Sequence, residues 1–303
     1  MHKFLRAVGF SQYTEKKQVQ KLIRDIIIHA DERSYTTVGK KTLVAEFDRN
    51  FAEDIGIAVC GEFDEDDTYS FDYYLPYLRS DLVSTAEDIS IERHAAKESY
   101  AGICDDPKVG VSLIFYLQNM ISYLKLQGEG KIPAKGTSLN LSALSCQGTI
   151  MMPIQKTEWQ KKKIAKDAVQ RNRLIQAARG GDEEAMESLT LEDMDTYTSI
   201  SRKIQKADIF SFVDTYFMPY GVECDQYSVI GEIEEVEKIR NIYTKEEIYR
   251  MKIESHDLEF VVCINSKDLL GEPQPGRRLK GQIWMQGTLN LVPYKAGPMD
   301  QKR

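Results

Sequence analysis

The chain has 303 residues, of which 42% are hydrophobic and 29% charged, and its formal net charge at pH 7 is −7. This length favours two domains, and the composition is that of an ordinary globular protein. The charge argues against nucleic acid as a partner, because residues 207–303 hold 12 basic and 16 acidic side chains. Phosphate binding needs a basic excess. The longest apolar run, residues 109–117, is well short of the roughly 20 residues of a membrane-spanning helix. We therefore expect a cytoplasmic protein without membrane contact.

The first predicted element is an amphipathic helix over residues 14–30. Val19, Leu22, Ile23 and Ile26 recur at helical spacing, and Thr14 is a residue type that caps helices. We expect this helix to cover one face of a sheet.

A meander of short strands is predicted next. The β-rich segments, each bounded by polar or Gly/Pro turns, are residues 41–50, 54–64, 69–78, 88–95, 99–106 and 109–117. No helix-length segment separates the first five, so an antiparallel sheet is expected. Residues 118–126 fit a strand or a helix. Residues 127–143, rich in Gly, Ser and Pro, predict a loop, and 146–154 a strand that returns to this sheet.

The character of the chain changes at residue 155. Residues 156–180 have the composition and spacing of a helix that ends at Gly180 and Gly181. Asp182 can cap a second helix, and helical residues continue after a predicted break near Thr190. We expect a helical connector over residues 155–206 that packs between two β-rich domains.

Strand patterns return in the last third of the chain. Residues 207–220 fit a strand or a helix that ends at a Pro-Tyr-Gly turn. Residues 226–291 alternate between apolar and polar positions, with a hairpin turn at 255–257 and a short helical turn at 266–270. This succession predicts a small β-barrel, for which an OB-like barrel is the nearest architecture.

The sequence thus predicts an α+β protein in three parts. Residues 1–154 form an antiparallel sheet with a covering helix, residues 155–206 a helical connector, and residues 207–303 an OB-like β-barrel domain. The two β-rich parts are expected to form separate layers.

Candidate functional side chains gather around the start and the end of the predicted barrel. The catalytic candidates are Asp214, Glu223 and Asp225, and the candidate binding groups are Tyr216, Arg277, Arg278 and Trp284. The carboxylates could serve as acid and base or hold a cation, or they could pair with the arginines as an ion network. The tryptophan could stack on a ligand ring, or belong to the core.

Other motifs with a chemical meaning are missing from the sequence. The five cysteines are scattered without a CxxC pair, and the four histidines lack metal-ligand spacing. No GxSxG elbow, GxGxxG loop or P-loop occurs. We therefore predict no metal site, no cofactor and no disulfide framework.

Three stretches of the chain carry a family resemblance: the opening MHKFLRAVGFS, residues 213–233 and residues 268–290. They resemble a bacterial family described as domain of unknown function 3881, found in clostridial Firmicutes. The resemblance covers nearly the whole chain and implies a cytosolic bacterial protein that forms one evolutionary unit. The family supplies no activity, cofactor or catalytic residue.

Three functions remain open. The first is a non-enzymatic binding or scaffold protein that takes a protein or peptide on the barrel face or in the inter-domain cleft. The second is a hydrolase-like enzyme with a carboxylate site in that cleft. The third is weak binding of single-stranded nucleic acid, which the charge disfavours. Convergence of the carboxylates in a cleft would favour the enzyme.

Overall fold

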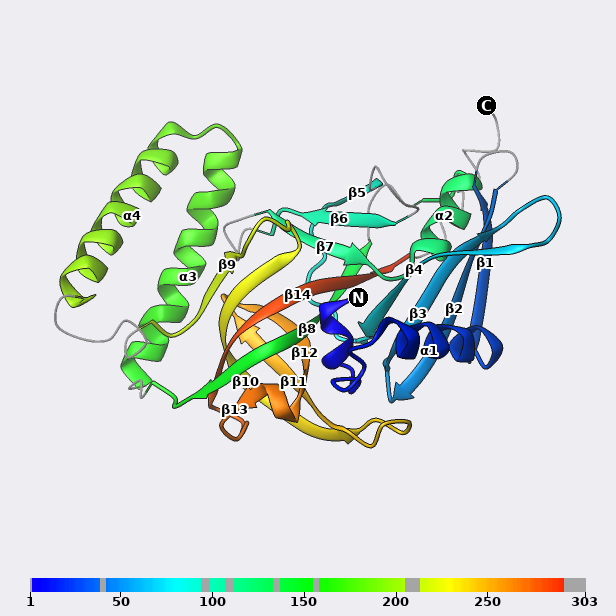
Figure 1. Ribbon diagram of the computed structural model, residues 1–303. Coiled ribbons are helices and arrows are strands. Elements are labelled where there is room, and N and C mark those ends of the chain that lie inside the picture. Colours follow the sequence, from blue (N-terminus) through cyan, green and yellow to red (C-terminus); the bar gives the residue numbers. More distant parts are fainter. Residues whose placement is uncertain are drawn as a thin grey trace, which may run out of the picture.

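The computed structural model describes residues 2–38, 42–93, 99–106, 112–132, 137–154, 158–204 and 213–291. It has an α+β fold with a four-stranded antiparallel sheet and a second, ten-stranded sheet, part of which closes into a five-stranded barrel (Figure 1). A pair of long helices stands to one side of these sheets. The predicted fold class is confirmed.

The N-terminal segment lies between the two sheets. A short 3-10 helix, η1 (Lys3–Arg6), is followed by the predicted amphipathic helix α1 (Lys16–Ile28). Its N-cap is Glu15, in a capping box with Gln18, and not Thr14 as the sequence suggested. The buried face of α1 packs with the four-stranded sheet, as expected.

The four-stranded sheet is an antiparallel meander. Its strands are β1 (Glu32–Val38), β2 (Thr42–Ala52), β3 (Ile55–Phe63) and β4 (Tyr69–Leu78), paired in chain order. The last three match predicted strands. β1 was not predicted, because this edge strand is mostly polar and exposed and carries little hydrophobic signal.

The next elements lead into the ten-stranded sheet. They are β5 (Ile89–Arg93), β6 (Tyr100–Cys104), β7 (Leu113–Leu117), the helix α2 (Met120–Gly128) and the long strand β8 (Ser138–Met151). Residues 118–126, left open between strand and helix, thus hold most of α2. The predicted loop 127–143 is partly wrong, because β8 begins at Ser138, and its buried Leu139, Leu141 and Ala143 alternate as strand residues do.

The remaining strands belong to the C-terminal third. They are β9 (Tyr216–Pro219), β10 (Gln226–Arg240), β11 (Glu247–Ser255), β12 (Leu258–Asn265), the 3-10 helix η3 (Ser266–Asp268), β13 (Leu269–Leu270) and β14 (Arg278–Asn290). β9 confirms a strand that ends at the Pro-Tyr-Gly turn, while residues 207–212 lie outside the described part. In the predicted hairpin, His256 and Asp257 both have positive φ, which is typical of a two-residue type I′ turn.

The barrel takes its fifth strand from the first half of the chain. β8 pairs parallel with β12 and antiparallel with β14, which closes the ring β8-β12-β11-β10-β14. In an OB barrel the third and fifth strands are parallel neighbours, and the fourth closes onto the first. Here β10, β11, β12 and β14 take the first four places, and β8 takes the fifth although it comes first in the chain.

This pairing corrects the prediction that residues 1–154 and 207–291 form separate layers. β8 belongs to the barrel and does not return to the four-stranded sheet, and β7 also pairs with β14. Alternation in a sequence shows that a segment is a strand, but it does not show which strand lies next to it.

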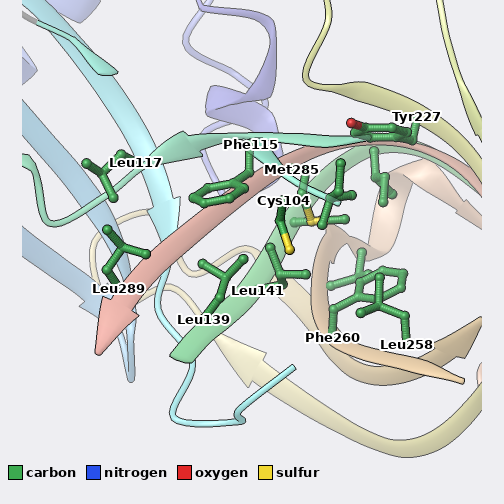
Figure 2. Packing of buried hydrophobic residues seen from close by; sticks show 14 of the residues in the cluster. Cys104, Phe115, Leu117, Leu139, Leu141, Tyr227, Leu258, Phe260, Met285 and Leu289 are labelled. Atoms are coloured by element: carbon green, nitrogen blue, oxygen red, sulfur yellow. The ribbon is translucent and has the colours of Figure 1, made fainter. Parts of the chain in front are cut away.

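The barrel interior forms one of two hydrophobic cores. Figure 2 shows residues from β7, β8, β12 and β14 meeting there, among them Phe115, Leu141, Phe260 and Met285. A second core holds α1, the N-terminal segment and the four-stranded sheet against the outer wall of the barrel. Trp284 belongs to this second core, while its neighbours on β14 point into the barrel.

The helical connector is a hairpin of α3 (Glu158–Arg179) and α4 (Glu183–Ile204). The break at the two glycines is confirmed, and the Asp182 side chain caps α4 by accepting a hydrogen bond from the amide of Ala185 at 3.1 Å. The break near Thr190 is wrong, because α4 continues through it. The hairpin does not pack between two domains as expected, but stands beside the barrel (Figure 1).

Buried Arg278 holds the two ends of this hairpin together. Its Nε donates to the carbonyl of Met152 at 3.0 Å, and its Nη1 donates to the carbonyl of Val213 at 2.7 Å. Met152 precedes α3 and Val213 follows α4, so one guanidinium spans the base of the hairpin.

Removal of the hairpin should therefore leave the rest folded. We expect that replacing residues 155–212 by a short Gly-Ser linker leaves the free energy of unfolding equal to that of the intact chain or slightly above it, because closing a shorter loop costs less entropy. Urea denaturation measures this. As a control, Arg278→Ala in the intact chain should destabilise by about 1–3 kcal/mol, since buried carbonyls lose their donor. Loss of cooperative unfolding after excision would show that the hairpin is part of the folding unit.

Candidate functional site

The structure separates the predicted site residues into two groups. Glu223, Asp225 and Trp284 line a cleft between the four-stranded sheet and the ten-stranded sheet, here called the inter-sheet cleft. The other four candidates lie outside the lining of this cleft.

Those four candidates make contacts within the barrel and at the base of the helical hairpin. Besides its other bonds, Arg278 reaches the backbone carbonyl of Asp214 at 3.4 Å. Burial lowers the pKa of Arg278, but an arginine remains charged at neutral pH. The Tyr216 hydroxyl lies 2.8 Å from the hydroxyl of Ser228, and Arg277 donates to the carbonyl of Glu272 at 2.7 Å.

The inter-sheet cleft has a volume of about 850 Å³. Its walls come from η1, β4, β5, β6, β7, β14 and the loop before β10. Aromatic rings form much of its lining: Phe4, Tyr73, Tyr74, Tyr116 and Trp284. Of these rings only the tryptophan was predicted as a site residue, because the others come from segments that only the fold brings together.

Direct contacts fix the orientation of the aromatic wall. The indole Nε1 of Trp284 donates a hydrogen bond to Oδ2 of Asp225 at 2.7 Å. The ring of Phe4 stacks on Trp284, with ring centroids 5.4 Å apart and planes at 25°. The Tyr74 hydroxyl accepts a hydrogen bond from the amide of His2 at 3.0 Å. The wall is therefore preformed, and Asp225 acts as its anchor.

Two tyrosine hydroxyls extend the wall toward the interior. Tyr116 donates to the hydroxyl of Tyr73 at 3.2 Å. Burial raises the pKa of both phenols, and electrostatic repulsion from the nearby Cys60 sulfur raises it further. Both hydroxyls are thus neutral and can donate and accept hydrogen bonds at any physiological pH.

The charged side chains of the cleft have both signs. Lys3 and Arg93 are basic, and Glu92 and Glu223 are acidic and exposed. The ammonium of Lys3 donates to Oε1 of Gln226 at 2.5 Å. A cleft with an apolar wall and charges of both signs suits a ligand that is itself dipolar.

The barrel face expected to bind a partner is covered by the chain's own N-terminal segment. OB barrels bind ligands on the face of their second and third strands, which here are β11 and β12. Asn265 donates to the carbonyl of Arg6 at 3.1 Å, and Asn241 donates to that of Val8 at 2.8 Å. Cys263 donates to the carbonyl of Ala7 at 3.2 Å. Ligand binding at this face would first have to displace that segment.

Glu246 completes this attachment. Its buried carboxylate accepts hydrogen bonds from the amide and hydroxyl of Ser11, from Asn265 at 2.6 Å and from Lys267 at 2.8 Å. Burial alone would raise the pKa of Glu246, but these hydrogen bonds lower it. A satisfied carboxylate of this kind is a structural anchor and is not poised for catalysis.

The open outer surface of the barrel is acidic. A bulge in β10 leaves Glu232, Glu234, Glu235 and Glu237 all exposed. Two basic side chains of β11 pair with such acids, because Lys252 lies 2.7 Å from Glu234 and Arg250 lies 2.6 Å from Glu237. This surface offers phosphates little attraction.

In the part of the chain that the structure describes, no three His, Cys, Asp or Glu side chains come together as metal ligands. No helix in those same ranges has the length and apolar character of a membrane span.

A family model described as "Domain of unknown function, E. rectale Gene description (DUF3881)" matches residues 5–287. This match confirms the family resemblance predicted from the three stretches. None of the curated proteins and none of the solved structures matches the chain.

The anchoring role of Asp225 leads to a prediction about stability. We expect Asp225→Ala to lower the free energy of unfolding by about 1–3 kcal/mol, because it leaves the buried indole N–H without its acceptor. Asp225→Asn keeps an acceptor oxygen and should cost less than the alanine variant. Urea denaturation of both variants measures the difference. Equal stabilities of the wild type and the alanine variant would show that this hydrogen bond does not hold the wall.

Proposed function

Because the chain belongs to this family of unknown function, we propose its function from the geometry of the inter-sheet cleft. The protein is a non-enzymatic binding protein, and its ligand is a peptide segment that inserts an aromatic or large apolar side chain. The observation that carries this proposal is the preformed aromatic wall, with Trp284 held by Asp225.

The size and chemistry of the cleft support this proposal. Ligand pockets commonly measure about 300–1,000 Å³ and have apolar walls with a few placed polar groups. The inter-sheet cleft falls in that range at about 850 Å³. Its rings are already positioned, so little conformational entropy is lost when a ligand binds.

The position of β4 favours a peptide over other apolar ligands. β4 is an edge strand of the four-stranded sheet, and its Tyr73, Tyr74 and Leu75 line the cleft. On the edge that β3 does not cover, the carbonyl of Pro76 accepts a hydrogen bond from Gln286. The backbone of Tyr74, two residues earlier, faces the same way. An extended peptide could pair with this edge while its side chains enter the cleft.

The arrangement of the carboxylates favours binding over hydrolysis. Hydrolysis by two carboxylates needs both groups at one substrate bond. Asp225 already accepts the hydrogen bond of Trp284, and Glu223 lies exposed on the preceding loop. The third candidate, Asp214, does not line the cleft.

Intrinsic fluorescence can test the proposal. Trp159 is 70% exposed and Trp284 only 5%, so Trp159→Phe leaves Trp284 as the single reporter of the cleft. This variant is titrated with capped pentapeptides that carry a central Phe, and with matched peptides that carry a central Ala. We expect saturable changes in Trp284 emission with some of the Phe peptides and weaker binding, by at least about tenfold, for their Ala partners.

A second substitution localises the binding. Ala101 lines the cleft, and Ala101→Phe should obstruct part of it and weaken the titration. Ile242→Phe places the same ring at an exposed position on the barrel and serves as the control. The proposal fails if no peptide binds, or if the Ala101 and Ile242 variants bind the peptides equally well.

Nucleic acid is expected not to bind. The acidic outer surface and the covered OB face both oppose phosphate contacts, so we predict an affinity for mixed-sequence single-stranded DNA or RNA weaker than roughly 10⁻⁴ M at physiological salt. Fluorescence anisotropy with a labelled oligonucleotide measures this. Micromolar binding that weakens as salt is added would contradict the prediction.

A further inference from the structure

A second cavity lies next to β2, and none of its lining residues belongs to the inter-sheet cleft. It has a volume of about 250 Å³ and lies between β2, α2 and the ends of β8 and β14. We call it the β2 pocket. Four carboxylates and one guanidinium line it: Glu32, Glu46, Asp48, Asp81 and Arg79. With all groups ionised, the pocket carries an excess of negative charge.

Asp48 presents an unused acceptor in this pocket. Its side chain is only 5% exposed. Oδ2 pairs with the guanidinium of Arg79, which also lies 3.6 Å from Glu32. Within the described ranges, Oδ1 is buried and accepts no hydrogen bond. A buried carboxylate oxygen without a donor is costly, so a donor group that reached this atom would be stabilising.

Glu46 faces the same pocket. It lies two residues before Asp48 on β2, so both side chains leave the strand on the same face. Oε2 of Glu46 accepts a weak hydrogen bond from the Cys60 thiol at 3.5 Å. Two carboxyl groups thus converge on a small cavity whose remaining lining is rich in amides and hydroxyls, such as Asn140 and Thr288.

We propose that the β2 pocket binds a small primary ammonium compound that carries hydroxyl groups. The ammonium would donate to Oδ1 of Asp48 and to Glu46, and the hydroxyls would bond with the amide and hydroxyl side chains of the lining. A metal ion fits less well, since no metal-ligand cluster occurs among the described residues. The small volume excludes a peptide or a nucleotide.

Protonation of Glu46 makes this binding depend on pH. The pKa of Glu46 is raised to about 8, mainly by burial; the neighbouring charges of Asp48 and Glu32 contribute to this rise, while Arg79 and the Cys60 thiol oppose it. The carboxyl is therefore mostly protonated at pH 7. A bound ammonium favours the ionised form, so binding releases a proton and strengthens as the pH rises.

The same group sets a pH dependence of stability in the free protein. In the unfolded chain Glu46 ionises near its ordinary pKa of about 4.3. Between about pH 5 and pH 8 the folded state holds a proton that the unfolded state has lost, so this contribution to stability falls as the pH rises. Glu46→Gln removes this dependence and is expected to fold normally, because it resembles the protonated carboxyl.

Isothermal titration calorimetry with a matched pair of probes tests the proposal. Glucamine is the primary amine of sorbitol, and its ammonium is still charged at pH 8. We expect saturable binding of glucamine and none of sorbitol. From pH 7 to pH 8 the affinity should rise about fivefold, because the ionised fraction of Glu46 rises by that factor when its pKa is about 8.

Variants assign the binding to this pocket. Asp48→Asn should weaken glucamine binding at least about tenfold, and Glu46→Gln should weaken it and remove the pH dependence. Glu235→Gln, an exposed acid on the barrel, should change nothing. Equal binding of sorbitol, no binding of glucamine, or unchanged binding in the Glu46 variant would each overturn the proposal. The Glu46 variant decides the matter even if Asp48→Asn unfolds.

Discussion

The pairing of β8 with β14 is the constraint on which the rest of the structure depends. The two strands run antiparallel from Met151 opposite Arg278 to Ser138 opposite Asn290, and their pairing closes the barrel. β14 also pairs with β7, so one strand joins the barrel to the sheet that leads into it. Both proposed sites follow from this arrangement. β14 carries Trp284 to the inter-sheet cleft and Thr288 to the β2 pocket, so a shift in this register would move both walls.

The N-terminal segment covers part of the outer wall of the barrel and buries the side chains there. Phe4 and Leu5 are buried against barrel residues such as Trp284, and Glu246 accepts the hydrogen bonds that hold the segment near Ser11. The surface that an OB barrel ordinarily offers to a ligand is thereby used for folding. Both proposed sites lie away from that surface, one in the inter-sheet cleft and the other in the β2 pocket. Fold type alone would have pointed to a face that the chain's own N-terminal segment covers.

Local elements could be predicted from the sequence, and their long-range partners could not. α1, β4 and the hairpin at His256 follow from spacing and turn chemistry, which act over a few residues. The role of β8 depends on strands more than a hundred residues away, and the strand begins inside the Gly-, Ser- and Pro-rich stretch 127–143, which resembles a loop. For the same reason, the sequence identified Asp225 and Trp284 as candidates but did not predict the hydrogen bond between them. In the sequence, Glu46 and Asp48 are two acidic residues of a predicted strand, with no indication of a charge partner. The fold buries both side chains, and this burial makes them candidates for a binding site.

Native-state hydrogen exchange of β8 tests the central claim most directly. If β8 is a wall of the barrel, its amides from Ser142 to Ser145 are protected by pairing with β12 and β14. They should then open with the same free energy as the amides of β10 to β12, which is that of global unfolding. Exchange of β8 at a distinctly lower free energy, while β10 to β12 remain protected, would contradict the account. It would mean that the barrel closes without β8 and that the two halves fold as separate units.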